Sequence, residues 1–272
     1  MRRAPFLQAT TLRMFALAAL AAGTTILGGC NDAGDVTGSI PAPPRAAAGD
    51  AELRAYAEAC QRRYEANPGE KAASIEYARA LRGLTRYREA VAVMQTAAVK
   101  SPKDEDVLGE YGKALADAGE LSQAKDVLTR AYTPDNPRWD VMSVQGAVAD
   151  QLGDHAGAMQ FYRDALKIAP GEPSVLTNMG LSLALAQRLP EAERALRQAV
   201  ASPKADARMR GDLALVLALQ GKYAEAEKVS EADLAPEAAR ANVEAIRRML
   251  ASGDRRGLGQ PAKAAIEANG AG

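Results

Sequence analysis

Histidine and cysteine are nearly absent from this sequence, which has one histidine, His155, and two cysteines, Cys30 and Cys60. A Ser-His-Asp set can therefore be built only around His155, and no His-Glu-x-x-His or paired-cysteine pattern is present to hold a metal. The segment 109–113 (GEYGK) lacks the spacing and the Ser/Thr of a phosphate-binding loop. These absences predict a protein that is not an enzyme and that uses no cofactor and no metal, with His155 exposed in a turn.

Aromatic side chains and an excess of either charge are also lacking. Aromatic residues make up 4% of the chain, and 34 basic residues balance 34 acidic ones. Without a basic excess the chain has no electrostatic footprint of a nucleic-acid-binding protein, so we expect no nucleic-acid partner. We also expect no small-molecule substrate. The Ala-rich background indicates helices that pack closely through small side chains.

Small residues recur with a fixed period. Gly112, Gly146 and Gly180 are each 34 residues apart. The same spacing of 34 relates a series of alanines: Ala90, Ala124, Ala158, Ala192 and Ala226. This period is typical of tetratricopeptide repeats, whose helix pairs stack into a solenoid. We therefore predict an all-α fold, a tetratricopeptide-repeat (TPR) right-handed superhelical solenoid of antiparallel helix pairs, in which the small residues let neighbouring helices approach closely.

In this phase the chain divides into five repeats. They are expected at residues 71–104, 105–138, 139–172, 173–206 and 207–235, between flanking helices at 50–67 and 237–251. The whole solenoid would span residues 49–251, and the glycines that follow it predict a flexible tail at 252–272. Cys60 lies on the apolar face of the first flanking helix and is expected to be buried.

The N-terminal part resembles the leader of a bacterial lipoprotein. Arg2 and Arg3 precede an apolar stretch at 14–27 that is too short to span a bilayer but suits a signal peptide. The stretch runs into the sequence LGGC at 27–30, which resembles a lipobox. The resemblance implies a lipoprotein signal peptide at 1–29 and lipidation of Cys30. The alternatives are an ordinary secretory signal or an uncleaved anchor.

A lipidated Cys30 would place the protein in the bacterial cell envelope, anchored by lipid and facing the periplasm. Residues 30–48 contain three prolines and two glycines and predict a flexible Pro-rich tether between the anchor and the solenoid. We favour the outer membrane. The inner membrane remains the alternative, because Asn31-Asp32 follow the cysteine and such positions influence sorting.

The concave side of the solenoid is expected to bind a protein partner. In related solenoids, positions 2, 5, 9 and 12 of the first helix in each repeat line this side. The candidate groove residues are Ile75, Arg79, Arg82, Asp106, Lys113, Asp140, Asp150, Thr177, Leu181 and Leu215. The set is charged at its N-terminal end and apolar at its C-terminal end, which suits an apolar helix or an extended segment with a few charges. The alternative is that the terminal helix at 237–251 fills the apolar end itself.

The end of the repeat array carries a closer resemblance. It contains the stretch 212–221 (DLALVLALQG), followed by 224–227 (AEAE), 233–239 (DLAPEAA), 241–243 (ANV) and 247–250 (RRML). Together with the lipobox, the tether and the repeats, these stretches resemble the TadD family, the tetratricopeptide lipoproteins of tight-adherence (Flp) pilus systems.

This resemblance implies a membrane-anchored protein-binding scaffold. It would be a pilotin-like accessory in Flp pilus assembly and secretion that acts on the outer-membrane secretin, with the secretin or another pilus-machine component as its partner. The alternative is a scaffold for another envelope complex, for barrel assembly, other pili or cell-wall synthesis.

Overall fold

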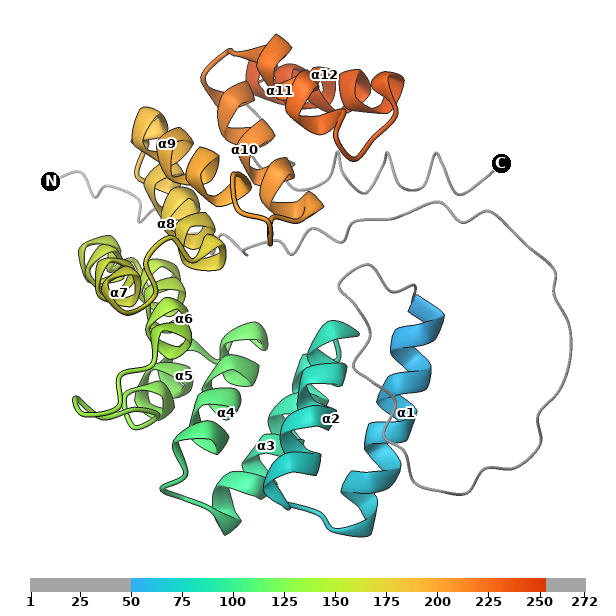
Figure 1. Ribbon diagram of the computed structural model, residues 1–272, viewed down its shortest axis with the longest axis vertical. Coiled ribbons are helices and arrows are strands. Elements are labelled where there is room, and N and C mark those ends of the chain that lie inside the picture. Colours follow the sequence, from blue (N-terminus) through green and yellow to red (C-terminus); the bar gives the residue numbers. More distant parts are fainter. Residues whose placement is uncertain (1–49, 253–272) are drawn as a thin grey trace, which may run out of the picture.

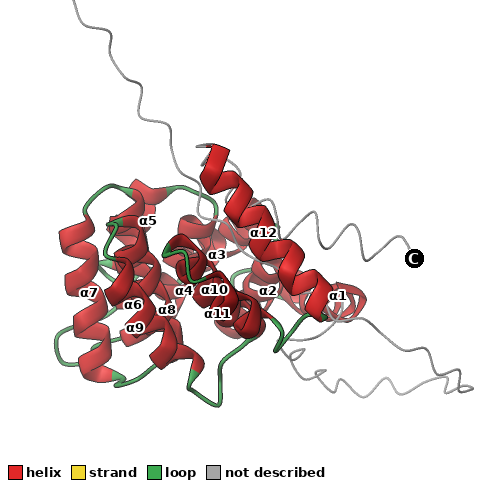
Figure 2. Ribbon diagram, turned by 90° about the horizontal axis from the view of Figure 1, so that it is seen from above, coloured by secondary structure: helices red, strands yellow, loops and turns green. Residues whose placement is uncertain are grey.

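The computed structural model describes residues 50–252, whose regular structure is helical apart from one isolated β-bridge between Thr133 and Asn136 (Figures 1 and 2). The helices are α1 (Asp50–Ala66), α2 (Lys71–Gly83), α3 (Tyr87–Lys100), α4 (Glu105–Asp117), α5 (Leu121–Leu128), α6 (Trp139–Gln151), α7 (His155–Ile168), α8 (Pro173–Leu185), α9 (Leu189–Val200), α10 (Ala207–Leu219), α11 (Tyr223–Ser230) and α12 (Pro236–Ser252). The predicted all-α solenoid is confirmed.

Five helix pairs follow one another along a curve, α2/α3, α4/α5, α6/α7, α8/α9 and α10/α11 (Figure 1). The first helices of successive pairs pack against one another, whereas the second helices contact mainly their own first helix and the next one. The first helices α2, α4, α6, α8 and α10 therefore line the inner, concave side. α1 packs on α2 at one end, and α12 packs on α10 and α11 at the other.

The glycines of the 34-residue period lie where the two helices of a pair meet. A Cβ atom added to Gly146 would lie 2.5 Å from the ring of Tyr162, and one added to Gly180 would lie 2.7 Å from Cγ of Leu196. Gly112 faces Leu128 in the same way. Only a residue without a side chain allows this approach, so the period in the sequence is a steric requirement of the helix pairs.

The turn within each pair uses a left-handed backbone conformation at one fixed position. Gly119, Gly153 and Gly221 have φ angles of 80°, 86° and 76° there, and Thr85 and Gln187 have 58° and 60°. Left-handed φ angles are unfavourable for residues with a side chain. The two non-glycine turns are therefore strained relative to the other three.

Several first helices begin with a side-chain cap. Glu70 accepts hydrogen bonds from the backbone of Ala72 and Ala73 at the start of α2, and Asp104 does the same for α4. Asp206 accepts from the Met209 backbone at the start of α10. These carboxylates satisfy amide groups that the helix leaves unpaired and favour its positive end.

Cys60 is fully buried on α1 and belongs to the core shared with α2 and α3. The expected signal peptide at 1–29, the lipidation site Cys30 and the tether at 30–48 lie outside the described residues, as does the expected tail beyond Ser252. None of the helices between Asp50 and Ser252 combines the length and the hydropathy of a membrane span.

Candidate partner-binding groove

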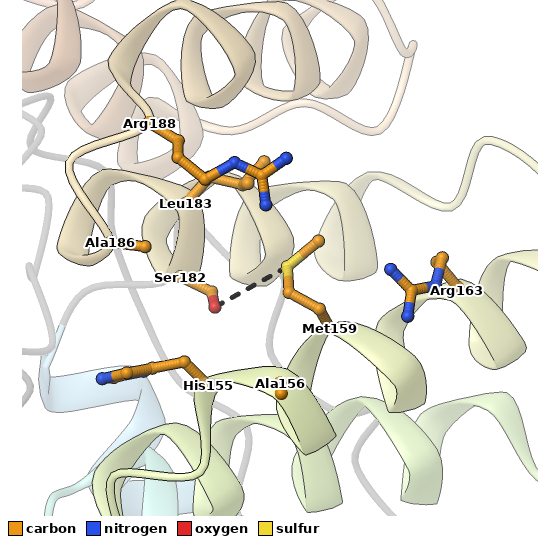
Figure 3. Close-up of a pocket in the computed structure, with 8 residues that line it drawn as sticks. All are labelled: His155, Ala156, Met159, Arg163, Ser182, Leu183, Ala186 and Arg188. Carbon is orange, nitrogen blue, oxygen red and sulfur yellow. Dashed lines mark hydrogen bonds between the residues drawn. The ribbon is translucent and has the colours of Figure 1, made fainter.

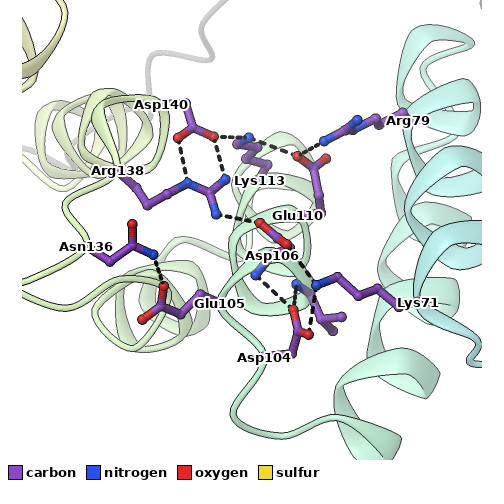
Figure 4. Close-up of polar contacts among 11 residues, drawn as sticks. Lys71, Arg79, Asp104, Glu105, Asp106, Glu110, Lys113, Asn136, Arg138 and Asp140 are labelled. Atoms are coloured by element: carbon purple, nitrogen blue, oxygen red, sulfur yellow. Dashed lines mark hydrogen bonds and ion pairs between the residues drawn. The ribbon is translucent and has the colours of Figure 1, made fainter.

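The N-terminal end of the concave side is occupied by a network of charged side chains (Figure 4). Glu110 on α4 lies at its centre, with a side chain that is 4% exposed. Its Oε1 accepts from Nη2 of Arg79 and from Nζ of Lys113, each at 2.9 Å, and its Oε2 lies 3.5 Å from Nη1 of Arg82. One carboxylate is thus shared by three cations from α2 and α4.

The network continues onto α6 and back to the start of α2. Nζ of Lys113 lies 2.8 Å from Asp140, and Arg138 bridges Asp140 at 3.1 Å and Asp106 at 2.7 Å. Lys71 pairs with Asp106 at 2.8 Å. These pairs connect α2, α4 and α6, the first helices of three successive repeats.

Charge pairing dominates the pKa values in this network. Burial raises the pKa of Asp140, but the hydrogen bonds from Arg138 and Lys113 outweigh burial and bring the pKa to about 2. Burial also opposes ionisation of Glu110, and the hydrogen bond from Arg79 with the charge on Lys113 again lowers the pKa. The acids are ionised at neutral pH and neutralise the cations within the protein, so this end is not a basic clamp for a partner's carboxylate.

A cavity of about 420 Å³ opens beside this network. Its lining includes Ile75 on α2, together with Arg79, Glu110 and Arg138. The cavity has acidic and basic groups in its wall, already paired with each other, and an apolar patch at Ile75. It can accept a mixed segment of a partner but offers no unbalanced charge.

The C-terminal end of the concave side is apolar. Leu181 on α8 and Leu215 on α10 occupy the repeat position that Arg79 and Lys113 occupy on α2 and α4, and both leucines are half-buried. α12 packs on α10 and α11, at the end of the array. A Cβ atom added to Gly211 on α10 would have no heavy atom within 4 Å. The terminal helix therefore packs at the end of the array and leaves the surface beside Gly211 uncovered.

The predicted groove residues thus fall into three groups. Arg79, Arg82, Asp106, Lys113 and Asp140 meet in the charge network, beside Ile75. Leu181 and Leu215 lie on the apolar concave face.

Asp150 and Thr177, the remaining two predicted groove residues, do not line an open groove because they are buried. The Thr177 hydroxyl donates to the carbonyl of Pro173 at 2.8 Å. The Asp150 carboxylate turns toward α7 and α8 instead of the concave surface.

Asp150 is the centre of a second polar cluster that joins α6, α7 and α8. Its carboxylate accepts from the hydroxyl of Tyr162 at 3.1 Å and from that of Ser182 at 2.9 Å, and it lies 2.9 Å from Nδ1 of His155. Burial, together with the charge of Asp150, raises the pKa of Tyr162. His155 is half exposed at the turn, as the sequence predicts, and has this additional contact.

A cavity of about 310 Å³ lies next to the Asp150 cluster, between α7 and α8 (Figure 3). His155, Met159 and Ser182 line it, with Arg163 and Arg188 at its edge. Ser182 and His155 both bind Asp150, so the histidine is not placed between serine and carboxylate as nucleophile activation requires. Residues 50–252 contain no group of three or more His, Cys, Asp or Glu side chains that could hold a metal ion.

Sequence reasoning missed three members of the groove. Glu110 and Arg138 organise the charge network, and Lys71 closes it. Asp212 on α10, a buried acid next to the concave face, was not singled out either. It is 5% exposed, and its Oδ2 has no hydrogen-bond partner. Burial raises the pKa of Asp212 to about 6. A repeated signal could have found two of these, because Glu110 and Asp212 occupy the same position of the 34-residue period.

A comparison with family models matches the tetratricopeptide repeat at residues 75–138, 111–173 and 177–242. The matched segments cover most of the helical array. A comparison with curated proteins gave no match.

Solved structures share the fold at low sequence identity. The Cut9–Hcn1 complex of the APC/C has a TM-score of 0.58 and 16% identity, over 71% of this chain and 40% of that chain. PilW, titled a widely conserved type IV pilus biogenesis factor, has a TM-score of 0.57 and 15% identity, over 67% and 86%. PilF of Pseudomonas aeruginosa has a TM-score of 0.50 and 18% identity, over 67% and 81%. This chain thus spans less than half of the Cut9–Hcn1 chain and most of each pilus protein.

Proposed function

Because the chain belongs to the tetratricopeptide repeat family, we propose that it is a lipid-anchored, pilotin-like scaffold of Flp pilus assembly that binds the outer-membrane secretin. Tetratricopeptide solenoids present extended concave surfaces for protein–protein interaction. In this proposal the protein holds its partner without chemistry, and acyl chains on Cys30 keep the complex at the outer membrane.

The observation that carries the binding function is the uncovered apolar face of α8 and α10. Leu181 and Leu215 are half-buried on the concave side, and α12 stacks beyond them without covering Gly211. Partly exposed apolar surface on a concave face is typical of partner recognition. The charges of the network at the other end are paired within the protein, so they are expected to set the shape of the groove more than its affinity.

Two further observations favour a pilus partner over another envelope complex. The stretch at 212–250 resembles the TadD lipoproteins, and two proteins with the same fold carry pilus names, PilF and the biogenesis factor PilW. The identities of 18% and 15% support a common architecture, and the pilus assignment is our proposal.

The test is affinity purification of the tagged protein from detergent-solubilised native membranes, followed by mass spectrometry. The comparison includes Cys30→Ser, which cannot be lipidated, and Leu181→Asp, which places a charge in the apolar groove. We expect recovery of a secretin with its pilus neighbours by the wild type, and loss of the secretin with Leu181→Asp.

Each variant separates one part of the proposal. Retention of the secretin by Leu181→Asp would move the binding site away from the concave face. Equal membrane association of Cys30→Ser would contradict the lipid anchor. Recovery of barrel-assembly or cell-wall proteins in place of a secretin would contradict the pilus role and keep the scaffold.

A further inference from the structure

Asp212 and Glu110 occupy equivalent places, three repeats apart. Each is the sixth residue of its repeat, on α10 and α4. Both carboxylates are buried, at 5% and 3% exposure. The side chains around the two sites can therefore be compared position by position.

Three cations surround Glu110: Arg79 and Arg82 from the preceding first helix, and Lys113 from its own helix. The residues in the equivalent positions relative to Asp212 are Leu181, Ala184 and Leu215. The repeat thus keeps the buried carboxylate and replaces each of its cations by an apolar side chain. Arg208, one turn away on α10, acts on Asp212 through its charge but does not form an ion pair with it.

An unpaired buried carboxylate is unfavourable for the folded protein. Oδ2 of Asp212 has no hydrogen-bond partner within residues 50–252. Desolvation of a charge without a counter-ion costs several kcal/mol, and proteins normally compensate such a group with a cation or hydrogen bonds. Within the described helical array, Oδ2 of Asp212 receives no hydrogen bond and no ion pair is formed, and the charge of Arg208 offsets only part of the desolvation.

Asp212 is buried, and the concave face next to it is uncovered at Gly211, its neighbour in the chain. Leu181 and Leu215 are half-buried, and the space beside Gly211 is empty to 4 Å. A cation that arrives on a partner would therefore approach along the same concave face from which Arg79 and Lys113 reach Glu110.

We propose that the concave face of α8 and α10 receives a partner segment in which a lysine or arginine is flanked by apolar residues, and that this cation pairs with Asp212. The apolar flanks pack on Leu181 and Leu215, and the cation supplies the charge that Arg79 and Lys113 supply to Glu110. This inference rests on the proposed binding function and specifies the chemistry of the segment that the groove selects.

The experiment uses the purified full chain and three fluorescein-labelled peptides. The peptides share one short leucine–alanine sequence and differ at a single central residue, which is lysine, glutamine or glutamate. Fluorescence anisotropy gives each dissociation constant. We expect the lysine peptide to bind about ten-fold more tightly than the glutamine peptide, as for a charge-assisted hydrogen bond, and the glutamate peptide to bind most weakly.

Two variants test whether Asp212 causes the preference. Asp212→Asn has the same shape and should bind the lysine and glutamine peptides equally. Leu181→Arg copies Arg79 into the second site, so it should neutralise Asp212 internally and also remove the preference. Asp126→Asn, which removes an exposed carboxylate from α5, is the matched control and should retain it.

Equal binding of the lysine and glutamine peptides to the wild type would overturn the proposal, as would an undiminished preference in Asp212→Asn. The membrane purification distinguishes this failure from failure of the pilus role. If Asp212→Asn captures the secretin as well as the wild type does, the pilus role is supported and the pairing of a partner cation with Asp212 is contradicted. If the lysine preference depends on Asp212 but the protein captures other envelope proteins, the pairing of a cation with Asp212 is supported and the pilus role is contradicted.

Discussion

At the two ends of the concave side, the carboxylate in the sixth position of the repeat has its pKa shifted in opposite directions. At Glu110 the neighbouring cations outweigh burial and the pKa falls below its ordinary value. At Asp212 burial prevails and the pKa rises to about 6. The backbone geometry is that of one repeat in both places, so the difference arises from three neighbouring side chains.

This comparison separates two uses of one scaffold. At the N-terminal end, ion pairs between α2, α4 and α6 join successive repeats and contribute to the stability of the array. At the C-terminal end the corresponding positions are apolar and half-buried, and Oδ2 of the buried acid has no hydrogen-bond partner within residues 50–252. In our proposal, a bound partner supplies at the second end the stabilisation that the first end obtains from its own side chains.

The largest change in stability is expected when the paired acid, Glu110, is removed. Glu110→Ala leaves Arg79, Arg82 and Lys113 close together without their shared carboxylate. We expect the free energy of unfolding to fall by about 2–4 kcal/mol, below the full cost of breaking a buried pair because Arg79 is partly exposed. Urea denaturation followed by circular dichroism measures the change. Asp126→Ala, at an exposed site, should stay within about 0.5 kcal/mol of wild type, and equal stability of both variants would show that the network contributes nothing.

The free energy of unfolding is expected to rise in Asp212→Asn, because this substitution removes the unpaired acid. The folded-state pKa of about 6 lies above the ordinary value of 3.8. As pH rises from about 4 to 6, the unfolded chain therefore loses its proton first and the folded state becomes less stable. The variant should gain about 2–3 kcal/mol at pH 7 and nothing below pH 4. Unfolding midpoints measured from pH 3.5 to 7.5 test this, and a gain that is constant with pH would exclude ionisation of Asp212 as its cause.

The repeat period was the reliable part of the sequence prediction, because the steric demand at Gly112, Gly146 and Gly180 depends on the backbone alone. The solenoid and its helix pairs follow from that demand. The direction of single groove side chains could not be predicted in the same way. Asp150 turns inward because Tyr162 and Ser182, from two other helices, offer it hydrogen bonds. Whether the sixth position is paired depends on residues 28 to 31 places earlier in the chain, such as Arg79 and Arg82 for Glu110.

Packing should not distinguish the two ends of the molecule. Gly112 lies against Leu128 in the charged half, and Gly180 lies against Leu196 in the apolar half. Replacing either glycine by alanine should cost about 1–2 kcal/mol through overpacking. Thermal unfolding of the two variants gives the comparison. Gly211→Ala is the control, since its added Cβ meets nothing within 4 Å; it should gain about 0.5–1 kcal/mol from helix propensity. A large difference between Gly112→Ala and Gly180→Ala would show that the halves differ in packing as well as in charge.

The smallest effects are expected at the strained turns, one in each half. Thr85 and Gln187 hold the left-handed conformation that glycine holds in the other three pairs. Thr85→Gly and Gln187→Gly should each raise the free energy of unfolding by about 0.5–1 kcal/mol, because the relief of strain exceeds the added chain entropy of glycine. Thr85→Gly should gain more, since a β-branched side chain is the most restricted in this region. Denaturant midpoints test both. A loss of stability at Gln187 alone would mean that its side chain stabilises its own turn, and that the two halves differ in their turns too.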